Sequence, residues 1–96
     1  MRQYELMMII DPALSKDDSA ALIKEIETEL KNSGAKIKTK DHPGEQNLAY
    51  KIRGSKIGYY LLYTLERNEG DFFDATRHFN MKPSIWRFMF VRTDNQ

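Results

Sequence analysis

The chain has 96 residues, a formal net charge of +1, 41% hydrophobic residues and 11% aromatic residues. This length predicts one domain, and the apolar content indicates a folded chain, not a disordered one. The absence of cysteine excludes disulfides, thiolate metal sites and cysteine nucleophiles, and it agrees with a cytoplasmic location. The chain begins without a signal-peptide pattern, and its first apolar run is too short to cross a membrane.

The first two elements are predicted to be a strand and a helix. Residues 2–10 alternate between two faces, and Asp11-Pro12 ends the strand because proline cannot donate to a ladder. From Ser15 to about Asn32, apolar residues recur at helical spacing. Ser15 is placed as the N-cap, with Asp18 three residues later to complete a capping box. Gly34 is the residue type expected just beyond a helix end.

The middle of the chain predicts two more strands. Ala35–Lys40 has strand character, Asp41–Gly44 is a turn cluster, and Asn47–Ile52 returns to strand character. This strand is therefore either long and interrupted or followed by a short extra piece. After the basic loop Arg53–Lys56, the stretch Gly58–Leu65 is apolar on both alternating faces. That pattern is typical of a strand in the middle of a sheet.

The last two elements complete a recognisable order. Asp71 to about Phe79 predicts a second helix, and Ile85–Arg92 predicts the last strand. Residues 93–96 are expected to form a frayed tail. The order strand, helix, strand, strand, helix, strand predicts an α+β, ferredoxin-like βαββαβ fold over residues 1–96 as a single domain. Its antiparallel sheet has four strands, with the first and third in the centre and both helices on one face.

The alternation divides the strand residues between two faces of this sheet. One face is expected to pack under the helix residues Ile23, Ile26, Leu30, Phe72 and Phe79, and it carries Tyr4, Leu6, Met8, Tyr63, Leu65, Phe88 and Phe90, with Trp86 on the same side of its strand. The other face is expected to be bare, and it carries Met7, Ile9, Tyr60, Leu62, Met89 and Val91, joined by Leu48 or Tyr50. An exposed apolar patch of this extent indicates an interaction surface.

The sequence offers no catalytic set. His42 and His78 lack metal-ligand spacing, Ser15 is explained as a helix cap, and no glycine-rich phosphate loop is present. We therefore expect no enzyme activity, metal, cofactor or small-molecule substrate. Basic residues at the margin of the bare face are candidates for RNA phosphate contacts, and they are Arg2, Lys51, Arg53, Lys56, Arg87 and Arg92. The methionine and aliphatic residues of the face itself favour a protein partner.

The sequence resembles bacterial small-subunit ribosomal protein six over nearly its whole length. The resemblance is carried by Met1–Glu5, Asp11-Pro12, Gly34-Ala35, Leu48–Ile52, Gly58–Tyr63 and Ile85–Arg92. It implies a ferredoxin-like structural protein of the ribosome. Such a protein binds the central domain of 16S-type ribosomal RNA as a heterodimer with small-subunit ribosomal protein eighteen.

Two departures limit which RNA contacts the resemblance implies. Many members carry arginines just before Leu-Ala-Tyr, where this chain has Glu45-Gln46-Asn47. A proline common after that tyrosine is replaced by Lys51. Contacts from this segment are therefore expected only through Lys51, and Arg2 and Arg87 are the first to be carried over by position.

A second class of function uses the same bare face differently. Two copies of the chain would close their open sheets on each other, as dimeric or small-molecule-binding regulatory modules do. Fold alone does not decide between these functions. Light scattering discriminates them, because a tight homodimer without RNA affinity supports the regulatory module. An enzyme is a distant third hypothesis.

Overall fold

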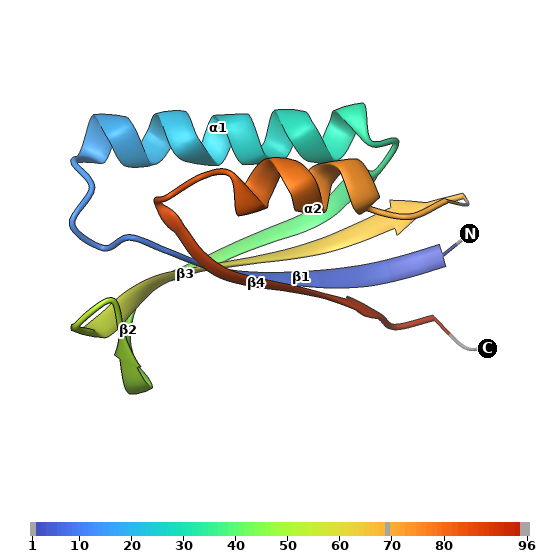
Figure 1. Cartoon of the computed structure of the whole chain (residues 1–96). Coiled ribbons are helices and arrows are strands. Elements are labelled where there is room, and N and C mark those ends of the chain that lie inside the picture. Colours follow the sequence, from blue (N-terminus) through green and yellow to red (C-terminus); the bar gives the residue numbers. More distant parts are fainter. Residues whose placement is uncertain (1, 69, 95–96) are drawn as a thin grey trace.

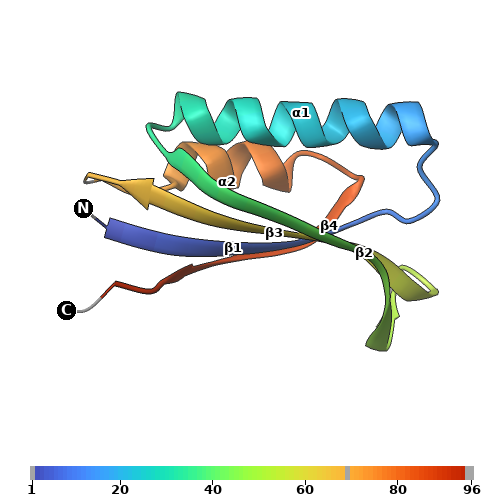
Figure 2. The same ribbon diagram turned by 180° about the vertical axis from the view of Figure 1, so that it is seen from behind.

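The computed structural model describes residues 2–68 and 70–94. The elements in chain order are β1 (Arg2–Ile10), α1 (Lys16–Asn32), β2 (Lys36–Ile52), β3 (Ser55–Arg67), α2 (Phe73–Asn80) and β4 (Ile85–Arg92). The strands form one antiparallel sheet in the order β2-β3-β1-β4. Both helices cover the same face of this sheet and leave the other face bare (Figure 1, Figure 2). The predicted ferredoxin-like fold is confirmed.

Helix α1 begins and ends where the sequence predicts. The backbone N–H of Asp18 donates to Ser15 Oγ at 3.1 Å, which is the half of the predicted capping box that the structure shows. At the other end, Gly34 has a φ of +93°. Its N–H donates to the Lys31 carbonyl, and the Ala35 N–H donates to the Leu30 carbonyl. This pair of bonds is a Schellman motif, which glycine favours because it tolerates positive φ.

The core lies between the helices and the covered face of the sheet. Its fully buried members include Leu6, Met8, Leu65 and Phe79. Around them pack the other residues that alternation predicts for this face, namely Tyr4, Ile23, Ile26, Leu30, Tyr63, Phe72, Phe88 and Phe90. The predicted core is confirmed, since β1 and β3 keep an uninterrupted register with each other and their alternate residues face the helices.

The Asp41–Gly44 cluster is not a turn, so that prediction is wrong. Strand β2 runs through it and stays paired with β3, with a register shift between Asp41 and Gly44. Gly44 absorbs the irregularity with a φ of +83°. Of the two alternatives, the long interrupted strand is therefore the one observed. Beyond this point the hairpin of β2 and β3 bends away from the helices (Figure 1).

Strand β4 has the predicted bounds but not the predicted facing at its start. Ile9 pairs with Arg87 and Ile10 pairs with Ile85, so Trp86 is an extra residue in a β-bulge. Ile85 therefore takes the buried core position, with 7% of its surface exposed. The bulge interrupts the predicted alternation, and Trp86 does not belong to the core cluster against which Phe88 and Phe90 pack.

Thr93 and Asp94, which follow β4, are hydrogen-bonded to Gln3 in β1. The Thr93 N–H donates to the Gln3 carbonyl at 2.8 Å, and the Gln3 N–H donates to Asp94 Oδ1 at 3.1 Å. Residues 95 and 96 of the expected frayed tail lie outside the described residues. Thr93 and Asp94 thus extend the pairing of β1 with β4 by a short stretch.

Candidate protein and nucleic-acid interfaces

The bare face of the sheet, which we call the open face, is built from cross-strand rows. In the middle row, Met7 of β1 lies between Leu62 of β3 and Met89 of β4, and Asp41 of β2 lies beyond Leu62. Neighbouring rows place Glu5 beside Thr64 and Val91, and Ile9 beside Tyr60 and Arg87. The open face is therefore an apolar strip along the two central strands and β4.

Two adjoining grooves hollow the open face, and Met7 and Met89 line both of them. The first groove is also lined by Leu62 and Val91, together with Glu5 and Asp41. The second groove is also lined by the remaining residues of the predicted partner set, which are Ile9, Leu48, Tyr50 and Tyr60. All eight predicted partner residues thus line one or both of these adjoining grooves.

Gly58 determines how the hairpin meets this surface. A Cβ atom at Gly58 would lie only 2.5 Å from Ile9 Cγ2 and 3.2 Å from Leu48 Cδ2. Because glycine has no side chain, Ile9 and Leu48 fill that space. Ile9 is consequently only 6% exposed. It lies on the open face as predicted, but it is covered and not accessible at the surface. Tyr50, whose facing the alternation leaves open, is 71% exposed and lines the second groove.

The six candidate phosphate-binding residues fall into two groups at opposite ends of the sheet. Arg2 and Arg92 lie where β1 begins and β4 ends. Lys51, Arg53, Lys56 and Arg87 lie at the hairpin of β2 and β3 and at the start of β4. Lys51, Arg53, Lys56 and Arg87 are exposed. Arg87 Nη1 donates to the Trp86 carbonyl at 2.7 Å.

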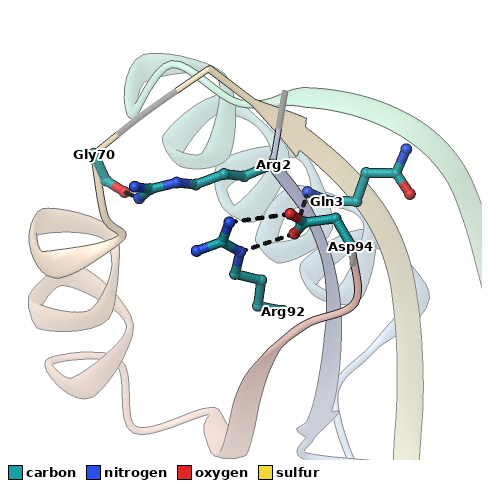
Figure 3. Close-up of polar contacts among 5 residues, drawn as sticks. All are labelled: Arg2, Gln3, Gly70, Arg92 and Asp94. Atoms are coloured by element: carbon teal, nitrogen blue, oxygen red, sulfur yellow. Dashed lines mark hydrogen bonds and ion pairs between the residues drawn. The ribbon is translucent and has the colours of Figure 1, made fainter. Parts of the chain in front are cut away.

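Arg2 and Arg92, at one end of the sheet, are both held by contacts within the chain (Figure 3). Arg2 Nη1 donates to the Gly70 carbonyl at 3.2 Å. Arg92 forms a two-point pair with Asp94, in which Nε lies 2.8 Å from Oδ1 and Nη2 lies 3.0 Å from Oδ2. The Arg92 guanidinium, followed by the Gln3 N–H, holds the pKa of Asp94 well below its usual range. Asp94 therefore stays ionised and partly neutralises Arg92.

The two histidines have different surroundings, and the buried Nε2 atom of His42 has no hydrogen-bond partner among the described residues. His42 packs edge-on against Tyr63, with 5.6 Å between ring centroids. His78 Nε2 lies 2.9 Å from Glu25 Oε2, and Lys82 contacts the same carboxylate. The Lys82 hydrogen bond contributes most to lowering the pKa of Glu25. Across the described residues, no three metal-ligating side chains gather, and no helix is both long and apolar enough to span a bilayer.

A profile of the ribosomal protein S6 family matches residues 3–92. The chain belongs to the ribosomal protein S6 family. S6 membership makes it a non-enzymatic protein of the small ribosomal subunit, and it confirms the predicted family.

S6 relatives are similar along the whole chain. Small ribosomal subunit protein bS6 of Koribacter versatilis is 30% identical over 99% of this chain and 65% of that protein. The bS6 protein of Fusobacterium nucleatum is 32% identical over 98% of this chain and all of that protein. The crystal structure of 30S ribosomal protein S6 from Thermotoga maritima superimposes with a TM-score of 0.90 at 22% identity, covering 96% of this chain and 87% of that one. This last likeness supports the fold.

Proposed function

We propose that this protein binds the central domain of 16S-type ribosomal RNA as a heterodimer with small-subunit ribosomal protein eighteen. The observation that carries the proposal is the uncovered apolar open face on a chain of the S6 family. Val91 and Met89, at its β4 side, are 43% and 53% exposed. Exposed apolar residues gathered in this way on a small domain mark a surface that a partner covers.

The two parts of the proposed interface have different chemistry. The middle row of the open face carries methionine and leucine, which suit a protein surface better than a row of nucleotide bases. Phosphate contacts fall instead to the basic residues at the two ends of the sheet. A net charge of only +1 is sufficient for this task if a basic partner supplies the remaining positive charge.

The open face also argues against self-association. Glu5 and Asp41 are exposed carboxylates that line its first groove. A second copy of the chain would add the same two carboxylates to the interface, and buried like charges oppose binding. A basic partner would neutralise them. Charge complementarity therefore favours protein eighteen over a homodimer.

A salt titration tests the RNA half of the proposal. The heterodimer is reconstituted with a central-domain transcript, and Kd is measured over a range of salt concentrations. Arg2→Ala and Arg87→Ala are each expected to weaken binding, because each removes one phosphate contact. Each should also lower the salt slope, which is the slope of log Kd against log salt concentration, by about one. Arg77→Ala is the matched control, since Arg77 is exposed on α2 and contacts the Phe73 ring. Unchanged affinity and slope in both test variants would contradict the assignment.

Breaking the Arg92–Asp94 pair is expected to strengthen RNA binding, whereas the arginine substitutions weaken it. Asp94→Asn is expected to tighten RNA binding several-fold and to steepen the salt slope by up to about one, because Arg92 is freed for a phosphate. Asp74→Asn, at an exposed position of the first turn of α2, controls for the change in net charge. Equal effects of the two substitutions would show that net charge alone is responsible.

A further inference from the structure

The turn between β2 and β3 holds an arginine in an unusual backbone conformation. Ile52 pairs with Ser55, so Arg53 and Gly54 form a two-residue hairpin loop. Their φ angles are +50° and +80°, and Arg53 is the one non-glycine residue with positive φ in the described ranges. A turn with two positive φ angles favours Asn, Asp or Gly at its first position. An arginine at this position indicates a use for its side chain, since backbone strain clusters at functional sites.

The bulge in β4 brings an aromatic ring to the same place. Trp86 is turned out of the core alternation and is half-buried, and it lines two hollows together with Arg53 and Pro83. One hollow also includes the carboxylate residue Asp11. The other includes Arg87, Lys82 and Asn80, and among the described residues no carboxylate lines it. The second hollow therefore combines two aromatic rings, those of Trp86 and Phe88, with one amide and three cations. One of the cations, Lys82, is paired with Glu25.

We propose that this second hollow binds one unpaired nucleotide of ribosomal RNA. The base stacks on Trp86, and the flanking phosphates contact Arg53 and Arg87. Single-stranded RNA is held in this way, by an aromatic platform beside positive charge. The open face is a poorer RNA site because its first groove carries Glu5 and Asp41. This inference rests on the proposed RNA binding, and it adds the nucleotide site and the stacking residue.

Trp86 is the only tryptophan of the chain, so its fluorescence reports on the site. The heterodimer is titrated with the central-domain transcript, and the same titration with Trp86→Phe is subtracted to remove the signal of protein eighteen. Binding of RNA is expected to quench Trp86. Trp86→Leu is expected to weaken binding at least fivefold with an unchanged salt slope, because stacking is lost but no charge is removed. Trp86→Phe keeps a ring and is expected to stay within about twofold of the wild type.

Two further variants distinguish the loss of an RNA contact from a loss of protein stability. Arg53→Asn is expected to lower the salt slope by about one while the hairpin becomes more stable, since asparagine adopts positive φ readily. A higher thermal midpoint with weaker RNA binding would identify Arg53 as a binding residue. Phe73→Leu is the control for the loss of an exposed ring, because Phe73 lies on α2 and is 63% exposed.

The outcomes distinguish this site from the proposed function. If the wild-type heterodimer does not bind the transcript, both proposals are wrong. If it binds but Trp86→Leu binds equally well, only the nucleotide site is wrong. If Trp86 emission changes when protein eighteen is added before RNA, and RNA adds nothing, the hollow contacts protein and the inference is overturned.

Discussion

A Leu62→Asp substitution is expected to weaken binding of small-subunit ribosomal protein eighteen by at least a hundredfold. Leu62 lies in the middle row of the open face, between Met7 of β1 and Asp41 of β2. A partner seated there would bury the introduced carboxylate without a counter-ion, which costs several kcal/mol. Asp41, directly opposite on β2, adds like-charge repulsion. The substitution leaves the core intact, because Leu62 does not belong to the core cluster.

Calorimetric titration of purified protein eighteen into wild type and variant measures this loss. Thr28→Asp is the matched control, because Thr28 is exposed on α1 and receives the same charge. Circular dichroism establishes that both variants keep their secondary structure. Equal binding by wild type and Leu62→Asp would show that the partner docks elsewhere, on the edge strands or the helices.

Phe79→Ala is expected to lower the free energy of unfolding by about 3–5 kcal/mol. The Phe79 ring is 0% exposed, and it packs edge-on against Phe88 of β4 with 5.5 Å between centroids. Truncation leaves a cavity between α2 and the sheet that neighbouring groups fill only in part. For a domain of this size, each kcal/mol corresponds to roughly 4–8 °C in Tm. The variant should therefore unfold at a temperature well below the Tm of the wild type.

Phe73→Ala gives the internal comparison on the same helix. Its ring is 63% exposed and lies under the Arg77 guanidinium, so truncation should cost below about 1 kcal/mol. Urea unfolding of the two variants and the wild type measures the difference. Similar losses at both positions would contradict the orientation of α2 on the sheet.

Most of the fold follows from local patterns in the sequence. The apolar spacing of α1, its Ser15 cap and its Gly34 end are all set within a few residues, so its bounds are predictable. The core side of β1 and β3 follows from strict alternation. The apolar residues left over by the same alternation predict the six open-face residues of β1, β3 and β4. For Leu48 and Tyr50 of β2, alternation leaves open which of them joins this face.

The features that alternation misses depend on neighbouring strands. Trp86 leaves the core because β4 slips by one residue against β1, and the sequence of β4 alone carries no sign of this. The Asp41–Gly44 cluster has turn chemistry, yet pairing with β3 keeps it in the sheet. Ile9 is covered because Gly58, on the adjoining strand, leaves room for Leu48. Each of these results from contacts between residues far apart in the chain.

The pair of methionines at the centre of the open face has a consequence for how this surface diverges between species. Met7 and Met89 lie side by side and line both grooves. Methionine is unbranched and has three rotatable bonds, so it adapts to differently shaped neighbours at little cost. A contact made through such side chains tolerates a larger or smaller residue in its partner. Two interacting proteins can then change their sequences one substitution at a time, without passing through a combination that no longer binds.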